Sequence, residues 1–90
     1  MRYILTGLKH RRWFYFIWDE YNELHLGNHF IKYWEAEEVF FNQYIITPNK
    51  KKHGPRRYRI DGKTNSGRKL RIIFEDFGAN TARIITGWDL

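Results

Sequence analysis

Two short basic segments carry the residues of this sequence that are best suited to chemistry on a polyanion. Their cationic residues are Arg56, Arg57, Arg59, Arg68, Lys69 and Arg71. Both segments alternate charged and apolar residues, as β-strands do, so Arg57 and Arg59 are expected on one face of a strand. Lys69 and Arg71 share one face of the next strand for the same reason. Because arginine can bind phosphate through two hydrogen bonds, these four cations, if aligned, predict a surface for RNA or DNA.

The net charge of +6 is distributed in blocks that support this interpretation. Residues 48–72 sum to +9 and include the run Lys50, Lys51 and Lys52, whereas residues 16–47 sum to −5. A positive block of this density attracts polyanions. Two alternatives stay open: a solvated basic face that only aids solubility, and a surface for an acidic protein.

Cleavage of RNA by its own 2′-hydroxyl needs a base, an acid and cations at the pentavalent phosphorane. Besides the arginines, the candidates are His25, His29, His53 and Tyr58, and the sequence alone does not assign the base or the acid. His25 and His29 are four residues apart, so they would share one face of a helix. No cysteine and no HExxH motif accompanies them, so we expect no metal site.

Aromatic side chains offer a second way to hold a nucleic acid, because they can stack on its bases. The candidates are Tyr33, Trp34, Tyr58 and Trp88. The competing interpretation is that they belong to the core, where most aromatic residues of so short a chain are needed.

The spacing of apolar residues predicts an α+β fold in which two N-terminal helices pack on one antiparallel sheet of about four strands. Asp19 can cap the first helix, and Gly27 and Asn28 are typical residues at a helix end. The expected order is β-α-α-β-β-β: a strand in 13–18, helices at 19–28 and 33–41, and strands at 57–62, 69–75 and 82–86, with a short additional strand at 44–47.

Length and composition limit the class of protein. A chain of 90 residues forms one domain, which we divide into a basic N-terminal extension at 1–13 and a core at 14–90. Neither a membrane-spanning run nor a secretory signal is evident, so we expect a cytoplasmic protein without a membrane partner. No cofactor motif is found, and a homodimer is one option for the assembly.

Several motifs together resemble the BrnT-type toxins, small proteins similar to the RelE ribonuclease fold. The first half contributes Ile17-Trp18-Asp19-Glu20, Asn22, His29 and the run 35–40. The second half is the closer match, with RYRIDGKT at 57–64, SGRKLRIIF at 66–74 and RIIT at 83–86. The similarity covers about residues 14–89.

The resemblance implies the toxin of a type II toxin–antitoxin system, which is a metal-independent endoribonuclease acting on RNA. Its partner would be a ribbon-helix-helix antitoxin of the BrnA kind, and the complex could bind operator DNA. Carried over position by position, the implied catalytic residues are Arg57, Tyr58, Arg68, Arg83 and His29.

The chain departs from the family pattern at three places. Arg56 stands where some members have an acidic residue, Gly87-Trp88 replaces the usual Ala-Arg, and the sequence stops at Leu90 where members continue into a C-terminal helix. These differences favour an alternative: a catalytically degenerate module that binds RNA or an antitoxin without cleaving.

Overall fold

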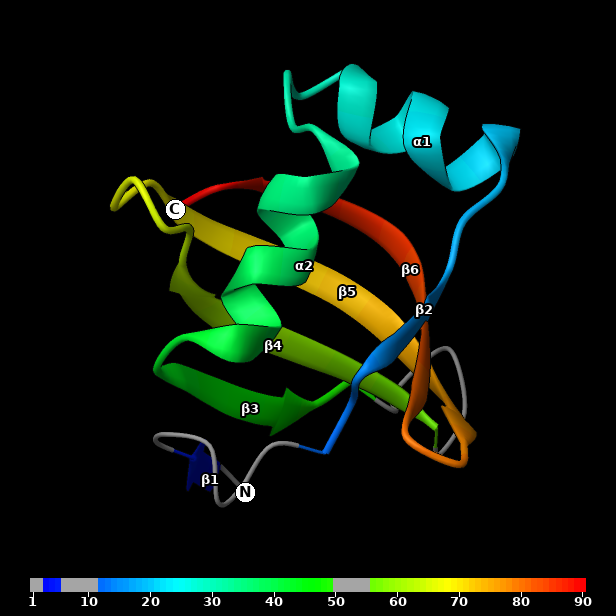
Figure 1. Cartoon of the computed structure of the whole chain (residues 1–90), viewed down its shortest axis with the longest axis vertical. Coiled ribbons are helices and arrows are strands. Elements are labelled where there is room, and N and C mark those ends of the chain that lie inside the picture. The colour runs from blue at the N-terminus through cyan, green and yellow to red at the C-terminus, as the bar shows by residue number, and fades with distance from the viewer. Residues whose placement is uncertain (1–2, 6–11, 50–55) are drawn as a thin grey trace.

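The computed structural model describes residues 3–5, 12–49 and 56–90, and for residues 3–5 it describes the backbone (Figure 1). The described part forms an α+β domain with two helices and a six-stranded sheet. Its elements are β1 (Tyr3–Leu5), β2 (Tyr15–Ile17), α1 (Glu20–Gly27), α2 (Tyr33–Phe41), β3 (Tyr44–Pro48), β4 (Arg57–Lys63), β5 (Lys69–Gly78) and β6 (Thr81–Asp89).

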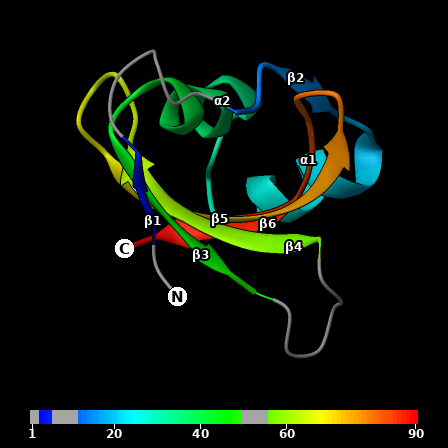
Figure 2. The same cartoon turned by 90° about the horizontal axis from the view of Figure 1, so that it is seen from below.

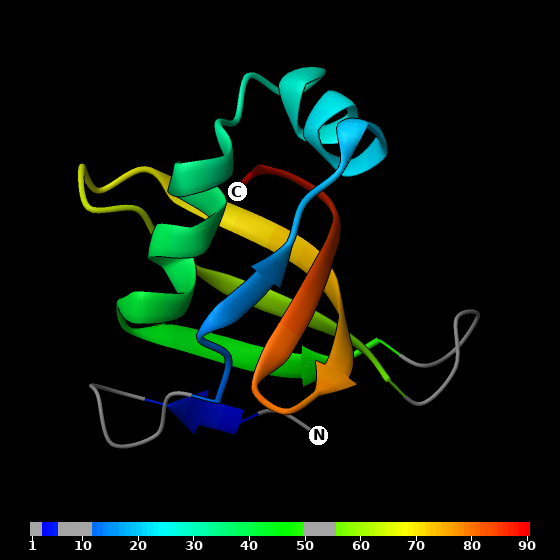
Figure 3. The ribbon, with the colours of Figure 1, turned by 45° about the vertical axis from the view of Figure 1, so that its right-hand side comes forward.

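The sheet has the strand order β1-β3-β4-β5-β6-β2. All neighbours are antiparallel except β2 and β6, which run parallel along one edge (Figure 3). The prediction of one antiparallel sheet of about four strands was therefore wrong in strand number and in direction. Alternation of side chains shows where a strand lies but not which strand it pairs with, so the parallel pairing of β2 with β6 could not be expected. Strand β1 lies within the segment 1–13, which was expected to be a basic extension.

Both helices are confirmed close to their predicted bounds. The Asp19 carboxylate accepts a hydrogen bond from the Asn22 backbone N–H at 3.0 Å, and the Asn22 side chain accepts one from the Asp19 N–H at 2.9 Å. This reciprocal cap begins α1 as the sequence predicts. Helix α2 buries Ala36, Val39 and Phe40 against the sheet.

The helices lie on the same side of the curved sheet (Figure 2). Between them and the strands is a core of large apolar side chains that includes Trp13, Phe40 and Phe74. The Trp13 and Phe74 rings are 4.8 Å apart, and Phe40 and Phe74 are 5.0 Å apart, both in edge-to-face geometry. The basic N-terminal segment thus also supplies a core residue, which its charge alone does not suggest.

A buried amide joins α1 to the parallel edge of the sheet. The Asn22 side chain is fully buried, and its Nδ2 donates to the carbonyls of Ile17, at 2.8 Å, and Ile84, at 2.9 Å. Because an unpaired amide is costly in a core, these bonds hold α1, β2 and β6 in one arrangement. Neither of the two described helices covers the opposite side of the sheet (Figure 2).

Candidate nucleic-acid interface

We call the side of the sheet that is turned away from α1 and α2 the open face (Figure 2). The alternation of β4 sends Tyr58 and Ile60 toward the core and Arg57 and Arg59 to the open face. On β5, the same alternation sends Arg71 there. These three arginines, the arginine cluster, line a surface depression of about 410 Å³. Its other lining residues are Asn49, Ile73, Ile85, Thr86 and Trp88.

Three polar atoms in this region are shielded from solvent and lack a hydrogen-bond partner within the described residues. They are Nε of Arg57, Nε of Arg59 and Oγ1 of Thr47. Thr47 lies directly opposite Arg59 across β3 and β4, so the three atoms come from adjacent positions of the sheet. Leaving such groups unpaired is unfavourable, and an anion that accepts hydrogen bonds would satisfy the two guanidinium donors.

Asp61 lies among these cations. Its carboxylate accepts hydrogen bonds from Arg71 Nε at 2.8 Å and Nη2 at 3.0 Å, and its Oδ2 is 4.0 Å from Arg59 Nε. The hydrogen bonds with Asp61 raise the pKa of Arg71 above its usual value. One of the three cluster charges is therefore already neutralised, and Arg57 is free of ion pairs with described residues.

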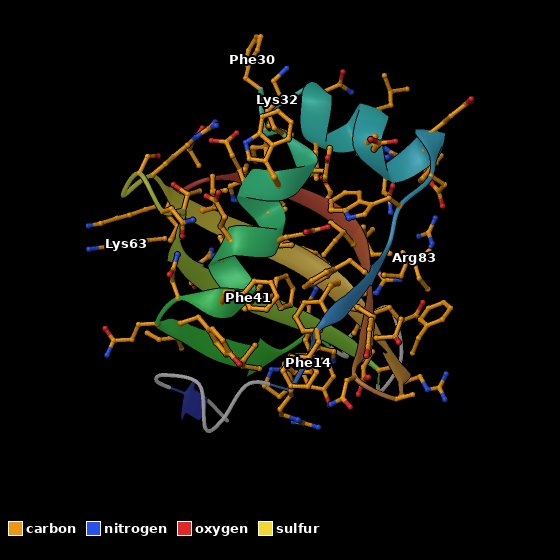
Figure 4. All side chains as sticks on the ribbon, viewed as in Figure 1. Phe14, Phe30, Lys32, Phe41, Lys63 and Arg83 are labelled. Atoms are coloured by element: carbon orange, nitrogen blue, oxygen red, sulfur yellow. The ribbon has the colours of Figure 1, made fainter. Side chains whose placement is uncertain are left out.

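The predicted group of four cations is only partly assembled. The β4–β5 register places Arg57 opposite Glu75, Arg59 opposite Ile73, and Arg71 opposite Asp61. Lys69 instead faces Lys63 at the hairpin end and lines a different cavity of about 840 Å³. Figure 4 shows Lys63 at the left of the domain and Arg83 at the right.

The remaining predicted nucleic-acid contacts are Arg56 and the lysine run at 50–52. Arg56 is exposed in the turn that precedes β4. Lys50, Lys51 and Lys52, together with His53, lie outside the described residues.

The five residues carried over from the resemblance do not share one surface. Tyr58 packs on the core side, with its ring 6.0 Å from that of Trp13 and 5.7 Å from that of Phe74. Its hydroxyl therefore does not face the arginine cluster. His29 is exposed between the helices, and its ring is 6.4 Å from that of Trp88.

Arg68 is engaged in a dense set of contacts. Its guanidinium donates to Asp89 at 2.7 and 2.9 Å, to Glu35 at 3.2 and 3.3 Å, and to the carbonyls of Phe30 and His29 at 2.9 and 3.3 Å. The hydrogen bond with Asp89 is the main cause that raises the pKa of Arg68. These contacts join the interhelical loop, α2 and β6, which is a structural role.

Arg83 is held in a similar way. Its Nη2 donates to Asp19 Oδ2 at 3.0 Å, which ties β6 to the start of α1. The hydrogen bond from the Asn22 backbone is the largest cause that lowers the pKa of Asp19, and Arg83 adds to it. Arg83 faces Glu75 across β5 and β6, so Arg57, Glu75 and Arg83 form one row across three strands.

Thr47 and Glu75 were not among the residues expected at this site. Thr47 belongs to the short strand whose pairing was not predicted. Glu75 stands in the alternating pattern Lys69, Arg71, Ile73 and Glu75, so its position on the open face was available from the sequence.

Comparisons with family models, with curated proteins and with solved structures gave no match to this chain. Within the described ranges, no group of three or more histidine, aspartate or glutamate side chains is arranged to hold a metal ion. Neither of the described helices has the length and apolar character needed to cross a membrane.

Proposed function

We propose that this chain binds RNA by holding its phosphate backbone on the arginine cluster. The observation that carries the proposal is the pair of shielded Nε atoms of Arg57 and Arg59, which have no hydrogen-bond partner among the described residues and lie two residues apart on one face of β4. Guanidinium groups bind phosphate well, and contacts of this kind position a nucleic-acid strand. The block charge of +9 at residues 48–72 supplies the long-range attraction.

The resemblance to BrnT-type toxins extends this proposal to cleavage. In this extended proposal, the chain has a RelE-like fold and is the metal-independent endoribonuclease of a toxin–antitoxin pair. A ribbon-helix-helix antitoxin neutralises it. The arginine cluster would stabilise the charge that develops on the phosphorane.

A proton acceptor for the attacking 2′-hydroxyl is available on the same face. Glu75 lies opposite Arg57 on β4 and opposite Arg83 on β6, and its carboxylate has no ion pair or hydrogen bond among the described residues. A carboxylate can accept the proton of the 2′-hydroxyl as its oxygen bonds to phosphorus, while the arginines hold the phosphate. The bond from phosphorus to the 5′-oxygen breaks, and the leaving oxygen takes a proton from water. We therefore assign the role of general base to Glu75.

A second candidate is a module that binds RNA without cleaving it. The positions of three carried-over residues favour it, because Tyr58 packs in the core and Arg68 and Arg83 are engaged by carboxylates. Both candidates share the binding surface and differ in the chemistry at Glu75.

Binding is tested with a short unstructured RNA at several salt concentrations. For the wild-type chain, affinity should fall steeply between about 50 and 200 mM salt, because binding releases counterions from the strand. The double variant Arg57→Gln and Arg59→Gln should bind RNA more weakly. Its plot of log affinity against log salt should also be less steep, by about 0.7 for each lost phosphate contact. Lys32→Gln removes a charge just before α2, far from the open face, and is the matched control (Figure 4). Equal effects of the two changes would contradict the proposal.

Cleavage is tested separately under single-turnover conditions with EDTA present. Loss of a general base should lower the rate by about 10²-fold or more, so Glu75→Gln should slow cleavage while RNA affinity is kept or increased. A chain that binds RNA but never cleaves it is the non-cleaving module. Activity that disappears in EDTA and returns with magnesium or zinc would overturn the metal-independent mechanism.

A further inference from the structure

Trp88 is the aromatic residue of the depression that holds the arginine cluster. It lies directly opposite Arg71 across β5 and β6, in the row that continues to Asp61 on β4. The depression between Trp88, Arg57 and Arg59 measures about 410 Å³, within the range of small-molecule sites. An indole surface and the guanidinium groups of Arg57 and Arg59, whose Nε atoms have no hydrogen-bond partner among the described residues, therefore line the same hollow.

The other aromatic candidates for base stacking are placed differently. The Tyr58 ring is stacked on Phe74 on the core side of the sheet. Tyr33 and Trp34 are half-exposed on α2, where their rings contact each other at 5.2 Å and no arginine cluster accompanies them. Trp88 alone among these four combines an aromatic surface with the cations on the open face.

We propose that Trp88 stacks on an unpaired base, so that the depression selects single-stranded RNA over duplex. This inference rests on the proposed RNA binding and specifies the form of RNA that the site takes. Trp88 stands in the row of Asp61, which is two residues from Arg59 and four from Arg57 along β4. With strands roughly 4.8 Å apart and a rise of about 3.4 Å per residue, the backbone at Trp88 is about 12 Å from that at Arg59 and about 17 Å from that at Arg57. All three side chains line the same depression, which suits a strand with a base on Trp88 and its phosphates on Arg59 and Arg57.

The physical basis of the selection is the accessibility of the base. Each base has a flat π-face that stacks on an aromatic ring regardless of sequence, but in a duplex that face is covered by neighbouring base pairs. Phosphates, by contrast, are accessible in both forms. The arginine cluster therefore attracts either form, and Trp88 adds affinity only for a strand whose bases are free.

The experiment compares three probes at one salt concentration: an unstructured RNA oligonucleotide, its duplex with the complementary strand, and an abasic strand of equal length. Trp88→Ala should weaken binding to the single strand by about tenfold, the usual contribution of one stacked base. Affinity for the duplex and for the abasic strand should stay unchanged. Trp88→Tyr keeps an aromatic ring and should retain most of the affinity.

Trp34→Ala is the control, because it removes a half-exposed tryptophan from α2. It should leave the affinity for all three probes unchanged. Thermal unfolding of each variant shows whether the domain remains folded at the assay temperature.

The possible failures are distinguishable. If Trp88→Ala lowers affinity for all three probes equally, or for none, the stacking role is wrong while RNA binding stands. If Trp88→Tyr is as weak as Trp88→Ala in spite of a folded domain, stacking is also wrong. If the wild-type chain binds no probe at low salt, both the stacking role and the proposed RNA binding are overturned.

Discussion

Asp61 and Arg71 lie directly opposite each other on β4 and β5, joined by two parallel hydrogen bonds of 2.8 and 3.0 Å. Arg71 lines the depression of the arginine cluster, and Asp61 lines the cavity of about 840 Å³ that Lys69 also lines. The Asp61 carboxylate also comes within 4.0 Å of Arg59 Nε. The attraction of the open face for an anion is therefore smaller than its number of arginines implies.

Removal of the Asp61 charge should strengthen RNA binding. Asp61→Asn keeps the shape of the side chain but leaves Arg71 without its carboxylate partner, so Arg71 can contact phosphate in addition to Arg57 and Arg59. We expect affinity to rise severalfold and the salt dependence to become steeper, by about 0.7 in the log–log slope for one added contact. Titrations with unstructured RNA at several salt concentrations measure both quantities.

Glu20→Gln supplies the matched control for that change. It removes an exposed carboxylate from α1, on the other side of the sheet. If both variants raise affinity equally, net charge explains the effect. Asp61 would then have no local role.

Arg68 should matter for stability more than for RNA. Arg68→Ala removes the donor to the Phe30 and His29 carbonyls and leaves the partly buried Glu35 carboxylate with the Lys32 backbone N–H but without its cation. We expect a loss of about 2 kcal/mol in the free energy of unfolding, measured with urea. Arg68→Lys should recover little, because one ammonium group cannot reproduce the guanidinium fork.

RNA affinity, measured where the Arg68 variants are still folded, should stay near the wild-type value. The opposite pattern, unchanged stability with lost cleavage, would restore Arg68 to the catalytic role that the resemblance implies.

Acid should weaken the fold through Asp19 and Asp89. Hydrogen bonds from the Asn22 backbone and then from Arg83 lower the pKa of Asp19, and hydrogen bonds from Arg68 lower that of Asp89. A carboxyl whose pKa is lower in the folded state stabilises the fold above its ordinary value near 3.8. That stabilisation is lost as the pH falls through the lower, folded value.

The measurement is the urea-unfolding free energy of the wild type and of Asp19→Asn with Asp89→Asn, taken from pH 6 downward. The double variant should be less stable near pH 6 and should lose less stability on acidification. Parallel curves for the two proteins would mean that these carboxylates do not contribute to the acid sensitivity.

Two glycines should respond in opposite ways to alanine. A Cβ at Gly87 would meet Ile72 Cδ1 at 2.5 Å, the Arg71 carbonyl oxygen at 3.0 Å and Leu26 Cδ2 at 3.2 Å. Because β6 passes close beneath α1 there, Gly87→Ala should cost about 1–3 kcal/mol. Gly27, at the end of α1, has nothing within 4 Å of an added Cβ.

Gly27→Ala is therefore the control, and it should be neutral or stabilising by up to about 1 kcal/mol, the difference in helix propensity. Urea unfolding measures both variants. A Gly87→Ala protein as stable as the wild type would show that Ile72 and Leu26 can move aside.

The elements were largely predictable because their signals are local. Asp19 caps α1, and the spacing of Ala36, Val39 and Phe40 identifies α2. The register of the β4–β5 hairpin follows from the position of its turn. Once the Thr64–Arg68 hydrogen bond closes that turn, Arg57 must lie opposite Glu75. The pairing of β2 with β6 was not predictable, because no local feature of Tyr15–Ile17 specifies a parallel partner.

The site was predictable in part for the same reason. Period-two alternation places Arg57, Arg59 and Arg71 on one face without knowledge of the fold. It cannot show that Asp61 neutralises Arg71, because that depends on the register. The ion pairs of Arg68 and Arg83 also depend on contacts between elements that are distant in sequence. Arg68 binds Glu35 and Asp89, and Arg83 binds Asp19.

The parallel edge also sets an order of events during synthesis. Asp19 and Arg83, which join α1 to β6, are 64 residues apart in sequence. At about 5–20 residues per second, several seconds separate the translation of β2 from that of its partner strand. In the finished domain, Asn22 Nδ2 donates a hydrogen bond to the Ile84 carbonyl of β6. Throughout that interval this carbonyl has not yet been made. The first helix therefore acquires its native place only after the last strand of the sheet has been made.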